Sequence, residues 1–358
     1  MPKTLALFCD GTWNTADQVT ENGERCSTNV IKLAVRMKMY ASDGTIQIGY
    51  YDQGVGTGNV FDRFTGGAFG DGLEANVYDA YRFLLANYEP GDKIYLIGFS
   101  RGAFTARSIG GMIRRCGILE RKHVIQYREA RRIHRCCKSD SPDAMTFRRN
   151  FAIEPDTPIH CIAVWDTVGS LGIPLRGFRY FTHRKYQFLD ASLNRFIKYG
   201  FHALAVDEHR GPFKPTLWDS APAAGQTIRQ VWFAGAHSDV GGGYGQHQLS
   251  DLAMDWMIDS VQNEAGLEFD SGLRADPNLK STGSYKGEVH DSKTGLYNLT
   301  MGLNRKIGKE GKGTEYFHRS LVEKWLNEPK YRPKPLRRHQ ARLKAIAAKP
   351  LTDEIYPV

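Results

Sequence analysis

The residues with the clearest chemical potential are 98–102, whose sequence is GFSRG. An apolar run at residues 93–99 precedes the serine, and a helical pattern, AFTARSIGGMIRR, follows it. A GxSxG turn between a strand and a helix exposes the serine hydroxyl and points the helix N-terminus at a developing oxyanion. The pattern alone is common in a glycine-rich chain, but this placement makes it specific. We therefore predict that Ser100 is a nucleophile; the alternative is a serine that only caps the helix.

A serine nucleophile needs a histidine base, and the base needs a carboxylate that fixes its tautomer. In α/β-hydrolases the chain order is serine, acid, histidine. Asp166 ends the apolar run at 158–166, and His237 ends the run at 229–237. If both runs are parallel strands, their carboxyl ends lie at one edge of the sheet, where open α/β sheets place their sites. The sequence predicts a triad of Ser100, Asp166 and His237.

Other acidic and histidine residues compete for these roles. The competing residues are Asp207, Asp239, His202, His290 and His318. Three glycines, 241–243, follow Asp239 closely, and consecutive glycines mark a backbone that bends tightly or approaches a ligand. We expect Asp239 to shape the loop that presents His237.

The loop that begins at Asp10 directly follows the apolar run at 4–9 and should lie near Ser100. We predict that the amides of Gly11 and Thr12 supply one half of an oxyanion hole and the amide of Arg101 the other half. Asp10 itself is expected to cap or shape a turn. An aspartyl-phosphate nucleophile of the haloacid-dehalogenase type would need an aspartate at position 8, where the chain has Phe8.

No pattern in the chain calls for a cofactor or a metal. The glycine-rich stretches 54–58 and 66–72 lack the spacing of dinucleotide or phosphate-binding loops, so we expect ordinary loops there. The six cysteines include no CxxC pair, and Cys9 and Cys161 lie inside apolar runs. The sequence therefore predicts neither a zinc site nor a disulfide framework.

The elements that must position these residues alternate along the chain. Near-continuous apolar runs, typical of parallel strands buried on both faces, occupy 4–9, 45–51, 93–99, 158–166 and 229–237. Apolar residues at helical spacing occupy 30–40 and 73–88. This order predicts an α/β fold: a doubly wound, mostly parallel sheet of the α/β-hydrolase type with helical insertions.

We predict a catalytic domain over residues 1–270. Residues 117–157 and 174–200 interrupt the alternation and are candidate insertions or lids. After about residue 270 the strand signal fades, so 271–358 is expected to be a peripheral basic segment packed on or beside the core.

The net charge of +9 is concentrated in two segments. Residues 305–349 contain 14 Lys and Arg against 4 Asp and Glu, and residues 114–149 contain 11 against 4. The second segment also contains apolar residues, a combination that suits a helix on an anionic membrane or over an acyl pocket. The apolar residues are Val124, Ile125, Tyr127 and Ile133. A solvated basic helix face is the other explanation, and nucleic acid is the less favoured partner.

The N-terminal apolar run is too short for a signal peptide, and no run approaches the roughly 20 residues that span a bilayer. We expect a cytoplasmic protein, or one exported without a cleavable signal.

Taken together, the motifs resemble the α/β-hydrolase family of the type VI secretion phospholipase effector-like catalytic domain. They are DGTWN, GVGTG, GFSRGAFTAR, VWDTVGSLG, HALAVDEHR and WFAGAHSDVGGGY, in that order over about residues 3–265. The resemblance implies a triad that maps onto Ser100, Asp166 and His237, and action on phospholipid acyl esters.

The expected function is therefore hydrolysis of carboxylic esters through an acyl-enzyme, on a phospholipid or another acylated substrate, without a cofactor. The alternative is a catalytically silent module that keeps the fold and binds anionic lipid or nucleic acid through its basic segments.

Overall fold

The computed structural model describes residues 2–11, 26–54, 66–168, 196–271, 282–293 and 302–358. Strands in these ranges form one eight-stranded sheet with the order β2-β1-β3-β4-β5-β6-β7-β8. Their bounds are β1 Thr4–Cys9, β2 Gln47–Asp52, β3 Lys93–Phe99, β4 Ile159–Trp165, β5 Ile197–Ala205, β6 Thr227–Phe233, β7 Glu315–His318 and β8 Ile355–Pro357.

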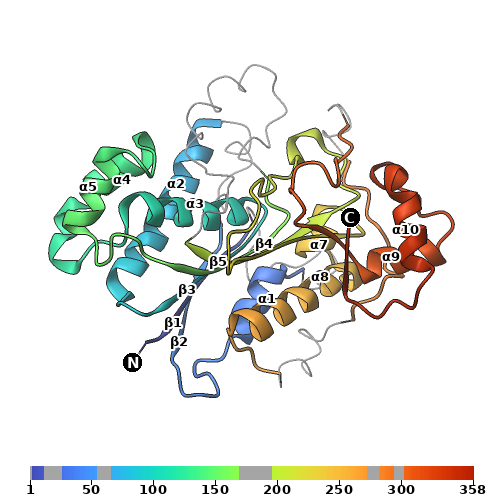
Figure 1. Cartoon of the computed structure of the whole chain (residues 1–358), viewed down its shortest axis with the longest axis horizontal. Coiled ribbons are helices and arrows are strands. Elements are labelled where there is room, and N and C mark those ends of the chain that lie inside the picture. The colour runs from blue at the N-terminus through green and yellow to red at the C-terminus, as the bar shows by residue number, and fades with distance from the viewer. Residues whose placement is uncertain (1, 12–25, 55–65, 169–195, 272–281, 294–301) are drawn as a thin grey trace.

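All neighbouring strands pair in parallel except β7 and β8, which are antiparallel. The central strands are apolar along nearly their whole length because helices cover both faces of the sheet. Helices α2 (Gly66–Asn87) and α3 (Arg101–Cys116) lie on one face, and α1 (Asn29–Arg36) and α8 (Gln248–Asp259) lie on the other (Figure 1). The predicted fold class is confirmed.

Five predicted strands appear within two residues of their expected starts. Strand β5 was not predicted. Its first residues lie in the predicted insertion at 174–200, so the end of that insertion was wrong; residues 174–195 lie outside the described residues. The short strands β7 and β8 were not predicted either. The glycine-rich stretch 66–72 was expected to be a loop, but it forms the first two turns of α2. Most of the other glycine-rich stretch, 55–58, lies outside the described residues.

The predicted insertion at 117–157 is helical. It contains a 3-10 helix, η2 (Arg121–Gln126), followed by α4 (Tyr127–Cys136) and α5 (Pro142–Phe151). It packs on the last turn of α3, where the Cys116 thiol donates to the Ala130 carbonyl at 3.1 Å. Since Ser100 precedes the first turn of α3, these helices contact the end of α3 that is opposite Ser100 (Figure 1). They do not form a lid over Ser100.

The apolar residues of that basic segment have different environments. Ile133 is buried in the core, whereas Ile125 is 83% exposed and Val124 is 54% exposed. Several of its bases are already paired within the protein, such as Arg135 with Glu74 and Arg132 with Glu129. The surface therefore presents less free positive charge than the sequence suggests.

The C-terminal segment is part of the main sheet and not peripheral to it. Strand β7 pairs with β6, β8 pairs with β7, and a third hydrophobic cluster joins them to helices α9 and α10. The helices in this segment are α9 (Arg319–Asn327), the 3-10 helix η7 (Lys334–His339) and α10 (Gln340–Ala347). A boundary at residue 270 would divide this sheet.

Short helices complete the described chain: η3 (Gly211–Phe213), α7 (His237–Gly241) and η4 (Ser260–Ala265), a π-helix that continues α8. Within the described ranges, no helix has both the length and the apolar composition needed to cross a bilayer.

Candidate active site

Ser100 occupies the sharp turn between β3 and α3. Its φ of 59° lies in the left-handed region, which a residue with a side chain adopts only at a cost. The glycines on either side make the turn possible: a Cβ on Gly98 would lie 2.5 Å from the Gly102 carbonyl oxygen, and one on Gly102 would lie 2.0 Å from the Cys9 oxygen. The GFSRG motif is thus required by close backbone packing between β3, α3 and the end of β1.

His237 reaches Ser100 from the other side of the sheet centre. It is the first residue of α7, four residues after β6 ends, and its Nε2 lies 2.7 Å from Ser100 Oγ. The ring is held between two aromatic side chains, with centroid distances of 4.7 Å to Phe99 and 5.0 Å to Phe213. This packing fixes the plane of the imidazole so that Nε2 faces the hydroxyl.

Asp166 completes the hydrogen-bonded chain at the carboxyl end of β4. Its Oδ2 lies 2.5 Å from His237 Nδ1, and its Oδ1 accepts the Ala205 amide at 3.1 Å. Asp166 also has a left-handed backbone, with φ of 39°. The structure therefore brings together the three residues that the sequence analysis selected.

A fourth residue, Arg305, contacts the Asp166 carboxylate and was not predicted from the sequence. It precedes β7 and forms two hydrogen bonds to Asp166, one to each carboxylate oxygen, of which the Nη2–Oδ2 bond is 2.9 Å long. The side chains of both residues are 0% exposed. Nothing in the sequence distinguishes this arginine from the other bases of the segment 305–349.

Arg305 and His237, the two side-chain partners of Asp166, determine its ionisation. Burial alone would raise the pKa of Asp166, but the Arg305 charge and the hydrogen bond from His237 hold it far below its usual range. Burial lowers the pKa of His237, and the nearby Asp166 opposes that shift only in part. The site thus holds an ionised Asp166 beside a His237 that is neutral at pH 7, the state a general base requires.

Glu208 accepts a hydrogen bond from the backbone at the start of α7. It lies in the HALAVDEHR motif and is 0% exposed. Its Oε2 accepts the His237 amide at 3.3 Å, and Arg210 forms hydrogen bonds with both of its carboxylate oxygens. Opposite charge from Arg210 keeps the pKa of Glu208 low despite burial, so it remains a carboxylate that holds the backbone of His237.

The competing residues from the sequence lie elsewhere. Asp207 accepts the Gly235 amide at 2.8 Å and the Tyr331 hydroxyl at 2.7 Å. His202 Nε2 accepts the Thr167 amide at 3.1 Å, and burial lowers the pKa of His202 to about 3, so it is a neutral core histidine. His318 accepts the Ser320 amide and caps α9.

A second histidine–aspartate pair lies beside the first. His290 Nδ1 is 2.6 Å from Asp239 Oδ1, and the His290 ring stacks on Tyr244 at 4.1 Å. Asp239 Oδ2 also accepts the Ala236 amide at 2.9 Å, which fixes the residue just before His237. Asp239 therefore contacts the turn that presents His237, while His237 itself pairs with Asp166.

Gly11, in the first loop, departs from its predicted role. Gly11 does not direct its amide at Ser100: the amide donates to its own neighbour, Asp10 Oδ1, at 2.6 Å. Asp10 also accepts the Thr28 and Tyr51 hydroxyls at 2.6 and 2.8 Å. Burial raises the pKa of Asp10 to about 6. Thr12 lies outside the described residues.

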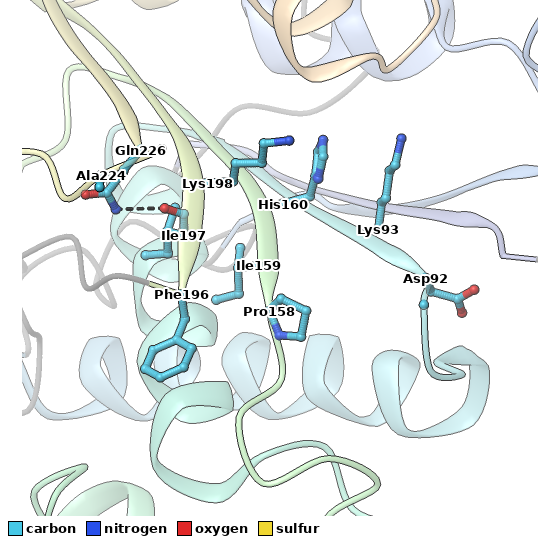
Figure 2. A pocket seen from close by; sticks show the side chains of 12 residues that line it. Asp92, Lys93, Pro158, Ile159, His160, Phe196, Ile197, Lys198, Ala224 and Gln226 are labelled. Atoms are coloured by element: carbon cyan, nitrogen blue, oxygen red, sulfur yellow. Dashed lines mark hydrogen bonds between the residues drawn. The ribbon is translucent and has the colours of Figure 1, made fainter.

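A pocket of about 390 Å³ opens at the amino ends of β3, β4 and β5, whereas Ser100, Asp166 and His237 lie at the carboxyl ends of the strands. Figure 2 shows Lys93, His160 and Lys198 pointing to one side of these amino ends. His160 already pairs with the Ala265 carbonyl at 2.9 Å. Because Ser100 follows the carboxyl end of β3, this pocket is separate from the triad. Among the described residues, no cluster of histidine, cysteine and acidic side chains could hold a metal.

Fold and site together define an α/β protein of the hydrolase class, with a serine on the strand–helix turn. Residues 3–260 match the family model described as "T6SS, Phospholipase effector Tle1-like, catalytic domain". The chain belongs to this family, which confirms the resemblance inferred from its motifs.

Three individual proteins that resemble this chain have at most 29% sequence identity to it. The uncharacterised protein YEL023C of Saccharomyces cerevisiae is 29% identical over 244 residues, which cover 62% of this chain and 33% of that protein. The chain thus spans about a third of the length of this curated relative. An uncharacterised protein from Pseudomonas aeruginosa has a similar structure, with a TM-score of 0.47, 18% identity, and coverage of 78% of this chain and 47% of that one.

The Tle1 effector, solved bound to the VgrG spike of the type VI secretion system, has a TM-score of 0.39 and 20% identity. The match covers 68% of this chain and 51% of that one.

Proposed function

We propose that this protein is a serine hydrolase that cleaves carboxylic esters of lipids through an acyl-enzyme. The observation that carries the proposal is the continuous hydrogen-bonded chain from Ser100 Oγ through His237 to Asp166, with bonds of 2.7 and 2.5 Å. The 2.7 Å distance from Ser100 Oγ to His237 Nε2 lies within the reach that general base catalysis requires. The left-handed turn at Ser100 is a second support, since strained nucleophiles of this kind occur at the turn of α/β-hydrolases.

In the first half of the reaction, Ser100 Oγ attacks the ester carbonyl carbon and its proton moves to His237 Nε2. Asp166 stabilises the imidazolium that forms, without taking a proton itself. The tetrahedral intermediate collapses when His237 gives the proton to the leaving alcohol, which leaves an acyl group on Ser100. In the second half, water gives a proton to His237 and attacks the acyl carbon. The bond from the acyl carbon to Ser100 Oγ then breaks, His237 returns its proton to Ser100 Oγ, and the carboxylic acid is released.

The developing oxyanion needs N–H donors near the start of α3. The amide of Arg101, directly after the nucleophile, is the proposed donor from the helix, where the helix dipole adds positive potential. Gly11 is not proposed in this role, because its amide is bound to Asp10. Thr12 keeps its place as the proposed second donor.

The substrate class rests on the family. A phospholipid ester is the proposed substrate, and an anionic membrane surface is the proposed site of action. The basic segments support action at an anionic membrane only through the bases that are not paired within the protein. Each such base near an anionic membrane strengthens membrane binding by about 1 kcal/mol.

The test compares hydrolysis of anionic and zwitterionic phospholipid vesicles, with nucleic-acid binding measured alongside. We expect faster release of acyl chains from anionic vesicles, with the preference falling as salt shortens the Debye length. Ester hydrolysis with equal rates on both vesicle types would remove the anionic surface from the proposal. No lipid turnover, together with tight nucleic-acid binding by the Ser100→Ala variant, would contradict the lipid substrate.

A further inference from the structure

Arg305 has more contacts at the centre of the molecule than an ordinary ion pair requires. Besides Asp166, its guanidinium donates to the Ala205 carbonyl at 2.8 Å and to the Phe213 carbonyl at 2.9 Å. These three partners come from the end of β4, the end of β5 and the end of η3. One side chain thus joins three segments that surround the triad.

Two of these partners also touch His237. Asp166 binds its Nδ1, and the Phe213 ring contacts the imidazole edge-on. A planar guanidinium can bind both oxygens of a carboxylate at once, a geometry that lysine cannot reproduce. The Asp166 carboxylate therefore has a fixed rotation, with Oδ2 shared between Arg305 and His237 and Oδ1 shared between Arg305 and the Ala205 amide.

We propose that Arg305 is a positioning residue of this catalytic site: it orients Asp166 for His237 and offsets part of the negative charge that His237 would otherwise experience. This inference rests on the proposed function but goes beyond a three-residue triad. It also explains why one base of the segment 305–349 is completely buried, since this base serves the site and not an external partner.

The charge effect has a definite sign. An ionised carboxylate next to a histidine favours the imidazolium and raises the histidine pKa. Arg305 weakens that influence, so His237 stays neutral to lower pH and remains available as a base. The other charged groups near His237 are Glu208, which favours the imidazolium, and Arg210, which opposes it, and they also pair with each other. Arg305 also lowers the pKa of Glu208, but Arg210 is the direct ion-pair partner of that carboxylate, whereas Arg305 is the direct ion-pair partner of Asp166.

Two substitutions separate charge from geometry. Arg305→Gln removes the charge but can still donate a hydrogen bond, so the acid limb of kcat/KM should move up by about one pH unit. Arg305→Lys keeps the charge but not the two-oxygen contact, so the acid limb should stay near its wild-type position. Both variants should lose about 10- to 100-fold in kcat, because small misplacements of catalytic groups are costly. Arg36→Gln, at an arginine of similar burial outside the site, is the control and should leave the limb unmoved.

An independent readout is the His237 titration, followed by NMR with histidine labelling and assigned with His237→Gln. The pH at the midpoint of this titration should be about one unit higher in Arg305→Gln than in the wild type, and close to the wild-type value in Arg305→Lys. An unmoved titration and acid limb in Arg305→Gln would overturn the charge role. Full kcat in Arg305→Lys would overturn the orienting role.

If neither variant folds, the double variant Arg305→Gln/Asp166→Asn, which leaves no unpaired buried charge, is compared with Asp166→Asn. Its His237 midpoint should be higher, because the Arg305 charge that disfavours the imidazolium is gone, and equal midpoints would overturn the charge role. The His237 titration can be measured whether or not the protein hydrolyses esters. Absence of any esterase activity in the wild type would therefore reject the proposed function and leave the effect of Arg305 on His237 measurable.

Discussion

Two histidine–aspartate pairs meet at the short helix α7, and their hydrogen bonds are nearly equal. His237 binds Asp166 at 2.5 Å, and His290 binds Asp239 at 2.6 Å. The first imidazole reaches Ser100 through its second nitrogen, and its side chain is 6% exposed. The second stacks on Tyr244, and its side chain is 28% exposed. The two pairs thus have similar hydrogen bonds, but they differ in exposure and in the residues around them.

The carboxylates differ most. Burial would raise the pKa of both, and it does so for Asp239, which has backbone amides and His290 as its partners. Asp166 has Arg305, whose charge keeps its pKa low. A hydrogen bond between a histidine and an aspartate therefore does not by itself indicate whether the pair has a structural or a catalytic role. The nucleophile and the arginine are what give the first pair its proposed catalytic role.

The largest expected effect is the loss of the nucleophile that only the first pair contacts. Ser100→Ala should lower kcat for ester hydrolysis by about 10⁴- to 10⁶-fold, since triad nucleophiles contribute this much. The fold should persist because, within the described ranges, the Ser100 hydroxyl bonds to His237 and supports no other element. Ser108→Ala, at a buried serine of the same helix, is the matched control and should retain activity. A Ser100→Ala variant with a tenth of wild-type activity would refute the assignment.

The two histidines should respond very differently to the same substitution. His237→Ala should cost about 10⁴-fold or more in kcat, because it removes the base. His290→Ala should change kcat by less than about 10-fold, since it acts only through the turn before His237. The double variant Ser100→Ala/His237→Ala should be scarcely slower than either single one. Equal losses at His237 and His290 in steady-state assays would abolish the distinction between the pairs.

The two aspartates should affect stability with opposite dependence on pH. The folded pKa of Asp166 is depressed, so its stabilisation is present above the unfolded value near 3.8 and is lost as pH falls. The folded pKa of Asp239 is raised, so its contribution is full below 3.8 and declines as pH rises through the folded pKa.

Denaturation midpoints of Asp166→Asn and Asp239→Asn, measured from pH 4 upward, test this difference. The deficit of Asp239→Asn relative to wild type should shrink as pH rises, whereas the deficit of Asp166→Asn should grow up to about pH 5 and then stay constant. Parallel curves for the two variants would show that their ionisation does not differ as described.

The smallest expected effect is on the acid limb of the wild-type pH profile. Because burial lowers the pKa of His237, the limb of kcat/KM should have its midpoint below the ordinary histidine value of 6.5. The His290→Ala variant should have the same midpoint. A midpoint that moves with His290 would mean that the second pair titrates with the catalytic group.

Much of this architecture could be predicted from local patterns. The strands that carry Ser100, Asp166 and His237 are continuous apolar runs, and the glycines of GFSRG mark the crowded turn directly. Strand β5 was missed because its lysine, glycine and histidine interrupt the apolar pattern, and β7 was missed because it is only four residues long. Their pairing depends on neighbours distant in the chain.

The residues around the triad were harder to predict for the same reason. Arg305 lies 139 positions from Asp166, within a segment rich in similar bases, so neither spacing nor composition distinguishes it. The Gly11 amide was expected at the oxyanion, because a first loop usually lies there, but the Asp10 carboxylate next to it binds it first. Contacts of this kind depend on side-chain geometry that a sequence pattern does not contain.

The most direct test of the central claim is labelling with a fluorophosphonate, which needs an activated serine but no knowledge of the substrate. Peptide mapping by mass spectrometry should find the adduct on Ser100 in the wild type, no adduct in Ser100→Ala, and strongly slowed labelling in His237→Ala but not in His290→Ala. An unlabelled wild type, or an adduct that persists in Ser100→Ala, would contradict the proposal that Ser100 and His237 form the reactive pair.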